Sequence, residues 1–146
     1  MTSSRRKFLD LADQDVRAFE KVMTCYQLPK STDEEKKIRK AELQEAFKNA
    51  AEVPFLLMEL TAEILDNAPD VIKATKVSVI SDAAIGVDLL YAALKSSRHN
   101  VRINLNYIKD ETFVVASESR IKILTSGRSR QRKGMQDTIK ETLTSR

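Results

Sequence analysis

The chain has 146 residues and a formal net charge of +4, with 42% hydrophobic and 32% charged residues. This composition predicts one soluble folded domain and excludes a disordered chain. No apolar run nears the roughly 18 residues that span a bilayer, so we expect no membrane segment; the single cysteine, Cys25, excludes an internal disulfide and favours a cytoplasmic location.

The first predicted elements are two helices, over residues 5–26 and 33–66. Only three glycines and three prolines punctuate the whole chain, which predicts an all-α bundle of long amphipathic helices. The first helix should end before Pro29, because the residue preceding a proline is driven out of the helical region. Thr32 with Glu35 matches a capping box for the second helix, and Ser31 with Glu34 offers an alternative register.

One residue of the first helix, Asp15, stands out by its position. At about 100° per residue it lies roughly 20° from the centre of a stripe formed by Phe8, Ala12, Phe19, Val22, Met23 and Tyr26. A lone carboxylate on an apolar face is paired, open to a cleft or protonated. Two interpretations stay open: an interhelical pin, for example with Arg39, or a general acid/base tuned by burial.

The second helix carries an apolar stripe that continues backwards through Arg39. We interpret Arg39 either as a side chain that reaches solvent from this stripe or as a buried cation that receives a carboxylate. Pro54 removes one backbone donor and frees the Ala50 carbonyl, so we expect a kink without a break. Lys30, in the preceding turn, is interpreted as a solvated loop lysine.

The middle of the chain has weaker sequence signals for secondary structure. "DNAPD" (residues 66–70) predicts a turn, and a third helix is expected over 82–97 with Ser81 or Asp82 as its cap. Residues 99–108 alternate like a strand, yet Asn100 and Asn104 are spaced as on one side of a helix. If they are helical, their amides could satisfy backbone groups or hydrogen-bond a heterocycle.

The last part is expected to contain a short helix from Asp110 that Gly127 ends, followed by a basic tail. Residues 1–126 contain 19 basic and 19 acidic residues, whereas residues 127–146 contain six basic and two acidic ones. We therefore predict a neutral helical domain over 1–126 and a weakly helical tail over 127–146. A neutral domain argues against nucleic-acid binding.

Metal or nucleophile chemistry has little support in the sequence. His99 is the only histidine, so no multi-histidine site can form, and we expect no metal. Cys25 has no histidine near it in the sequence to activate it, which favours a packing role.

Four blocks in order resemble one family: "LADQDVRAFEKVM", "YQLPKSTDEEKKIRKAELQEAFKNAAEVP", "SDAAIGVDLLYAAL" and "NVRINLNYIKDETF". They cover about residues 6 to 115 and resemble the cyclodeaminase family of folate enzymes, which includes methenyltetrahydrofolate cyclohydrolases. The resemblance implies an all-α fold, assembly into homodimers or larger homo-oligomers, and a tetrahydrofolate derivative as substrate. The match begins after the family's Gly-rich N-terminal helices, so we expect the chain to lack them.

The resemblance also implies roles for particular residues. The family's catalytic aspartate lies four residues before a phenylalanine, which corresponds to Asp15 before Phe19. Lys30 and Arg39 would suit the anionic glutamate tail of folate, and Asp82, Asn100 and Asn104 the pterin edge.

The implied reaction is either closure of formimidoyl-tetrahydrofolate to 5,10-methenyl-tetrahydrofolate with loss of ammonia, or hydrolysis of the methenyl bridge. The alternative is a non-catalytic helical interaction module in which Asp15 is only a polar pin.

Overall fold

A computed structural model describes residues 2–144, and all the regular secondary structure in this part of the chain is helical. Its elements in chain order are α1 (Thr2–Tyr26), α2 (Asp33–Ala74), the short 3-10 helix η1 (Val77–Val79), α3 (Ile80–Leu105), α4 (Glu111–Thr125) and α5 (Arg128–Thr144). The predicted all-α fold of long helices is confirmed.

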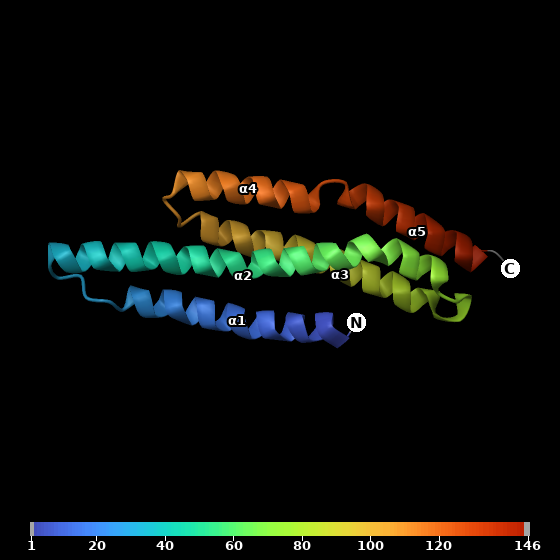
Figure 1. Cartoon of the computed structure of the whole chain (residues 1–146), viewed down its shortest axis with the longest axis horizontal. Coiled ribbons are helices and arrows are strands. Elements are labelled where there is room, and N and C mark those ends of the chain that lie inside the picture. The colour runs from blue at the N-terminus through green and yellow to red at the C-terminus, as the bar shows by residue number, and fades with distance from the viewer. Residues whose placement is uncertain (1, 145–146) are drawn as a thin grey trace.

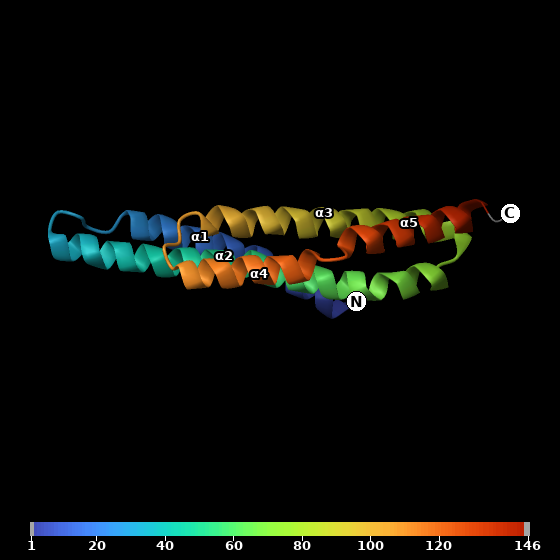
Figure 2. The ribbon, with the colours of Figure 1, turned by 90° about the horizontal axis from the view of Figure 1, so that it is seen from above.

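The helices form an elongated bundle around α2, which contacts α1, α3, α4 and α5 (Figure 1). Helices α1 and α3 run opposite to α2, while α4 and α5 follow one another along the length of α3 (Figures 1 and 2). The turn between α4 and α5 contains Gly127, whose φ of 72° is in the left-handed region that glycine tolerates. The prediction that Gly127 ends the helix that starts near Asp110 is therefore confirmed.

The start of α2 follows the predicted capping box. The Thr32 hydroxyl accepts a hydrogen bond from the Glu35 amide at 3.2 Å, and the Glu35 carboxylate accepts one from the Thr32 amide at 3.0 Å. Two amides of the first turn region are satisfied in this way, so the register with Thr32 as cap is the one adopted.

The predicted turn at residues 66–70 is wrong, because α2 continues as a helix through Pro69 to Ala74. Pro69 has no amide hydrogen for the Leu65 carbonyl, which is four residues earlier. Instead, Nε2 of Gln131 in α5 donates to that carbonyl oxygen at 2.8 Å. A side chain from a distant part of the chain thus replaces the missing helical hydrogen bond.

Pro54 lies in the same helix and is compensated in the same way. The Ala50 carbonyl oxygen accepts a hydrogen bond from Nδ2 of Asn104 in α3 at 3.0 Å. Residue 104 lies inside α3 because this helix extends to Leu105, beyond the predicted end at residue 97. The helical interpretation of residues 100 and 104 is therefore confirmed. Of the two roles considered for their side-chain amides, Asn104 has the first, which is to hydrogen-bond a backbone group.

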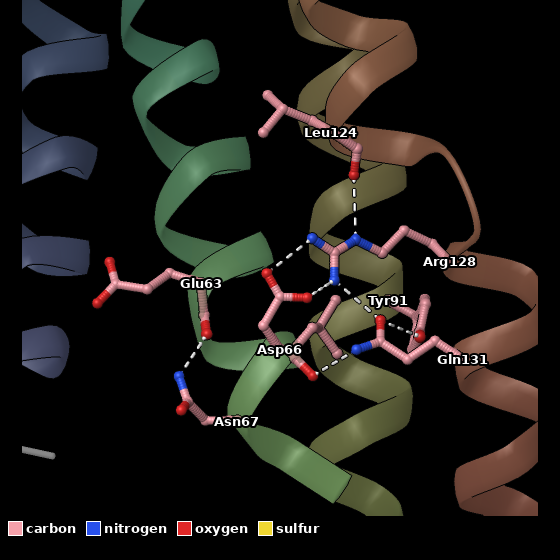
Figure 3. A network of polar contacts seen from close by, with 8 residues as sticks. Glu63, Asp66, Asn67, Tyr91, Leu124, Arg128 and Gln131 are labelled. Carbon is pink, nitrogen blue, oxygen red and sulfur yellow. Dashed lines mark hydrogen bonds and ion pairs between the residues drawn. The ribbon is translucent and has the colours of Figure 1, made fainter.

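The segment expected to be a weakly helical tail is α5, a packed helix of 17 residues, so that expectation is wrong. Met135 and Ile139 are buried in the core cluster. Arg128 at the start of α5 forms an ion pair with Asp66 of α2 and donates to the Leu124 carbonyl, and Gln131 accepts from the Tyr91 hydroxyl of α3 at 3.1 Å (Figure 3). These contacts and the two apolar anchors stabilise a segment whose composition alone predicts little helix.

Helix α4 is held to α2 by a second arginine. Arg120 donates to Glu52 and Glu59 at 2.8 to 3.0 Å, and its guanidinium lies 4.4 Å from the centre of the Phe55 ring. Phe55 is fully buried in the core. The arginine therefore covers the core with its planar face while its hydrogen bonds stay at the half-buried edge.

Helix α3 leaves much of its apolar surface uncovered. Residues 77–105 are long and apolar enough to cross a membrane by composition, and 22% of the most apolar window is buried in the bundle. A single such helix is weak grounds for a membrane segment, since helices of soluble proteins pass the same test. Ile85 and Leu89 are 59% and 65% exposed. An exposed apolar face of this kind is typical of a surface that contacts another protein.

We expect Gln131→Met to destabilise the fold by about 1–3 kcal/mol, because the Leu65 carbonyl loses its donor. The same substitution should cost less in a Pro69→Ala background, since residue 69 then supplies an amide hydrogen to that carbonyl. Urea unfolding of the two single variants and the double variant measures this coupling. Gln136→Met, an exposed glutamine on the same helix, is the matched control; an equal cost of Gln131→Met in both backgrounds would contradict the pairing.

The ion pair of Arg128 with Asp66 predicts a pH dependence of stability. Hydrogen bonds from Arg128 hold the pKa of Asp66 below its ordinary value of 3.8. Because this pKa is lower in the folded than in the unfolded chain, the pair stabilises the fold above about pH 4, and its contribution is lost as the pH falls through the folded-state pKa.

Arg128→Gln should therefore lower the free energy of unfolding at neutral pH, by about 1–3 kcal/mol, and reduce the further loss on acidification from about pH 5 to about pH 3. Urea midpoints over this range are the measurement. Arg130→Gln, an exposed arginine two residues away, should retain the full acid dependence. An unchanged acid dependence in Arg128→Gln would show that the pair does not contribute.

Candidate active site between α1 and α3

A pocket of about 380 Å³ opens between α1 and α3, and we call it the α1–α3 pocket. Helix α2 also contributes to its lining, as does Tyr107, the second residue after the end of α3. The lining residues are Asp15, Phe19, Val22, Met23 and Tyr26 of α1, Phe47 and Ala50 of α2, and Asn100, Ile103, Asn104 and Tyr107.

Three sequence-predicted site residues, Asp15, Asn100 and Asn104, line this pocket together. They come from α1 and α3, and about 85 residues of chain separate the aspartate from the asparagines.

Asp15 itself is exposed at the pocket wall, so of the three situations considered for it (paired, protonated or open to a cleft) the structure shows the one that is open to a cleft. The buried face of α1 contains Leu11, Val22 and Cys25, and on a helical wheel its centre lies to one side of the predicted stripe. Phe19, which follows Asp15 by one turn, is 63% exposed and faces the pocket as well. Asp15 has no ion pair or hydrogen bond with residues 2–144, so the interhelical pin with Arg39 is not formed.

The two asparagines offer different groups to a ligand. Both amide hydrogens of Asn104 are engaged, one with the Ala50 carbonyl and the other with the Asn100 carbonyl, each at 3.0 Å. Asn104 therefore presents its side-chain oxygen as an acceptor. Asn100 is exposed and keeps both the donor and the acceptor of its side-chain amide available, since no hydrogen bond within residues 2–144 uses them.

Aromatic rings form the apolar part of the pocket. The Tyr107 ring stacks on Phe47 at 4.8 Å between ring centres with an angle of 11°, and Tyr26 meets Phe47 edge-on at 6.3 Å. Tyr26 and Tyr107 are 43% and 51% exposed, so each keeps ring surface free for a flat ligand.

The backbone that carries Tyr107 is fixed by Gln44 of α2. Its Nε2 atom donates to the Tyr107 carbonyl at 2.9 Å, and its Oε1 atom accepts from the Lys109 amide at 2.7 Å. A two-sided contact of this kind holds the turn after α3 in one conformation, so the stacked tyrosine is positioned before a ligand arrives.

The remaining predicted site residues lie outside the pocket. Lys30 is exposed in the turn between α1 and α2. Arg39 donates to the Tyr26 carbonyl at 3.1 Å and lies 5.7 Å from the centre of the Tyr26 ring, next to the pocket wall. Asp82 lies in the first turn of α3, about 27 Å along the helix from Asn100 at 1.5 Å per residue.

Arg39 pairs with no carboxylate within residues 2–144, so of the two interpretations considered for it, the cation that receives a carboxylate is not observed. Its position beside the last carbonyls of α1 is one that a cation occupies favourably, because the helix dipole is negative there.

Sequence reasoning missed Phe47, Ile103 and Tyr107 as site residues. The signal was present for two of them, because Asn100, Ile103, Asn104 and Tyr107 follow the spacing of one helical face. Phe47 had no such signal, since an aromatic residue on an apolar helix face is most often a core residue.

Metal-ligand chemistry has no cluster to support it in the described part of the chain. Residues 2–144 contain no group of three or more histidine, cysteine, aspartate or glutamate side chains that could hold a metal ion. His99 is exposed, and Cys25 is 1% exposed within the core.

Comparison with known proteins gives one consistent result. The sequence model of the formiminotransferase-cyclodeaminase family matches residues 1–123. A methenyltetrahydrofolate cyclohydrolase of Methylorubrum extorquens is 38% identical over 142 residues, which are 97% of this chain and 66% of that protein. A formimidoyltransferase-cyclodeaminase of Sus scrofa is 32% identical over 118 residues, covering 81% of this chain and 22% of that protein.

A solved structure agrees with these sequence relatives. The crystal structure of a formiminotetrahydrofolate cyclodeaminase from Thermotoga maritima superimposes with a TM-score of 0.76 and 30% identity. The match covers 98% of this chain and 65% of that one. The chain thus spans about two thirds of the cyclohydrolase and of the solved cyclodeaminase, and about a fifth of the formimidoyltransferase-cyclodeaminase. By sequence and by fold, the chain belongs to the formiminotransferase-cyclodeaminase family.

Proposed function

We propose that this chain acts in one-carbon metabolism on a tetrahydrofolate derivative, with the α1–α3 pocket as its substrate site and Asp15 as the group that transfers protons. The observation that carries the proposal is the position of Asp15. It is a carboxylate with no partner in the described chain, at the wall of a pocket that also contains aromatic rings and two amides. The names of the relatives support the folate chemistry.

The two reactions suggested by the relatives share a tetrahedral carbon between N5 and N10 of the folate. In cyclisation, N10 attacks the formimidoyl carbon and loses its proton, and the leaving nitrogen, which carries one hydrogen, gains two protons, one of them from solvent, and departs as ammonia to leave the cationic methenyl bridge. In hydrolysis, water adds to the cationic methenyl carbon and loses a proton, N5 gains one as its bond to that carbon breaks, and the remaining hydroxyl loses its proton to give the formyl group. A carboxylate at the reacting carbon can accept and return these protons.

The other pocket residues have binding roles in this proposal. The exposed ring surfaces of Tyr26 and Tyr107 would stack against the flat pterin or aminobenzoyl ring. Asn104 would accept a hydrogen bond from a ring N–H through its side-chain oxygen, and Asn100 would donate or accept.

Charged residues near one end of the pocket complete the substrate site. Arg39, which contacts Tyr26, and Lys30 in the adjacent turn remain the proposed contacts for the anionic glutamate tail. Asp82 is not part of the proposed site, because its distance along α3 separates it from the pocket of its own chain.

Asp15→Asn should lower turnover of formimidoyl- or methenyl-tetrahydrofolate by about 100- to 10,000-fold, because the amide cannot exchange the proton. Folate binding and the unfolding midpoint should change little, since the side chain is exposed and unpaired. The measurements are the absorbance of methenyl-tetrahydrofolate during turnover and a separate folate-binding titration. Running both substrates decides between ammonia release and hydrolysis.

Asp13→Asn is the matched control, because Asp13 is exposed on the opposite side of α1 and lines no part of the pocket. It should retain full activity. Folate binding without any turnover in the unsubstituted chain, or equal turnover in Asp15→Asn, would remove Asp15 as the catalytic group. Absence of both binding and turnover would favour the alternative of a non-catalytic helical module.

We also propose that the protein functions in the cytoplasm as a homodimer or larger homo-oligomer. The uncovered apolar face of α3, with Ile85 and Leu89, supports an interface with a second copy. Sedimentation should give a mass above that of one 16.5 kDa chain, and Leu89→Glu should shift it towards the monomer. Val115→Glu, an equally exposed apolar residue on α4, is the control; a monomeric unsubstituted chain at micromolar concentration would contradict the proposal.

A further inference from the structure

A second pocket, of about 220 Å³, lies between α3 and the α4–α5 segment, and we call it the basic pocket. Half of its lining residues are cationic, and none is acidic. The cations are Lys95 and Arg98 of α3 and Arg128, Arg132 and Lys133 of α5. Packing of α5 against α3 therefore brings the excess positive charge of the C-terminal segment beside two cations of the otherwise neutral domain.

Two of the five cations are neutralised within the protein. Arg128 forms the ion pair with Asp66 that Figure 3 shows, and Arg132 pairs with Asp88 at 2.8 Å. Lys95, Arg98 and Lys133 form no ion pair with any residue in the range 2–144. The pocket thus has a surplus of three positive charges in a small volume.

Of these three residues, Arg98 gives the strongest indication that the pocket binds an anion. Its Nε atom is buried and has no hydrogen-bond acceptor among the described residues. A buried guanidinium N–H without an acceptor is costly, and arginine presents its donors in a planar fork that matches carboxylate and phosphate oxygens. An anion from outside the chain can reach the terminal nitrogens of Arg98, which are not buried and form no hydrogen bond within residues 2–144, and its charge would offset part of the cost of placing this guanidinium here.

The first turn of α5 adds a positive electrostatic potential at the basic pocket, which favours an anion. Gly127 precedes it and has no side chain that could act as a cap, and the first turn contains no acidic residue. Ser129 of this turn lines the pocket. The positive end of the helix dipole and the hydroxyl group of Ser129 therefore act together with Arg98, Lys95 and Lys133.

We propose that the basic pocket binds a small anion with phosphate or carboxylate oxygens, held by Arg98, Lys95, Lys133 and the first turn of α5. The small volume favours a compact anion over a nucleic-acid backbone. The site is separate from the α1–α3 pocket. Arg98 and Asn100 are two residues apart on α3, so their side chains lie about 200° apart around the helix axis, on nearly opposite faces. The proposal therefore holds whether or not the proposed folate reaction is correct.

The test is a titration of the 146-residue chain with inorganic phosphate and, separately, with citrate, at an ionic strength kept constant with sodium chloride. Calorimetry should give saturable binding, and the unfolding temperature should rise with the occupied fraction. Arg98→Gln should weaken binding about tenfold, which is the loss of one charge-assisted contact, and Lys133→Ala by a smaller factor. Phosphate binding without citrate binding assigns a phosphate ligand, and the reverse assigns a carboxylate ligand.

Arg130→Gln and Lys140→Ala are the matched controls, since both residues are exposed cations of α5 outside the basic pocket. Both variants should bind the anions as the unsubstituted chain does. The proposal is overturned if neither anion binds beyond the effect of chloride, if Arg98→Gln retains full affinity, or if a short DNA duplex displaces phosphate and binds more tightly.

The folding of Arg98→Gln is checked by circular dichroism. If this variant is unfolded, backbone amide shifts in the unsubstituted chain replace it as the criterion. Phosphate should then shift the amide signals of Gly127 and Ser129, and unchanged signals at these positions would refute the site.

Discussion

A buried backbone carbonyl that lacks its usual helical N–H donor needs a hydrogen bond from another group. The long central helix α2 contains two such carbonyls. Pro54 and Pro69 cannot donate to Ala50 and Leu65, yet α2 continues through both positions for 42 residues. The donors come from side-chain amides of other helices, Asn104 in α3 and Gln131 in α5. Each proline of α2 is therefore also a point at which a neighbouring helix is attached in a defined register.

The attachment at Pro54 has consequences for the candidate active site. Asn104 uses both amide hydrogens to hold α3 against α2, and the same residue lines the α1–α3 pocket. What remains for a ligand is its side-chain oxygen. A residue that stabilises the helix pair thus also determines which hydrogen-bonding group the pocket presents, and the stacked rings of Phe47 and Tyr107 line the same pocket.

The attachment at Pro69 has the corresponding effect on the other side of α3. Gln131 and Arg128 hold α5 to α2, and this places the cations of α5 beside those of α3. Helix α3 therefore separates two unlike surfaces. One is an aromatic pocket with a single carboxylate, and the other is a small pocket with unpaired positive charges.

The all-α fold, a capping box at residue 31 or 32, the end of α4 at Gly127 and the family follow from the amino-acid sequence alone, because these features depend on local spacing and on motifs. The structure selects Thr32 as the cap. The sequence also singled out Asp15, Asn100 and Asn104 as candidate site residues, and the structure places them in one pocket.

Two features depend on packing between helices: where each helix continues and which apolar faces are buried. The continuation of α2 through Pro69 and the folding of α5 depend on contacts of Arg128 and Gln131 with Asp66 and the Leu65 carbonyl, which are more than 60 residues earlier in the sequence. Likewise, a helical wheel finds an apolar stripe on α1 but cannot tell which part of it contacts α2. The part that contains Asp15 and Phe19 lines an open pocket, because burial depends on where the neighbouring helices lie.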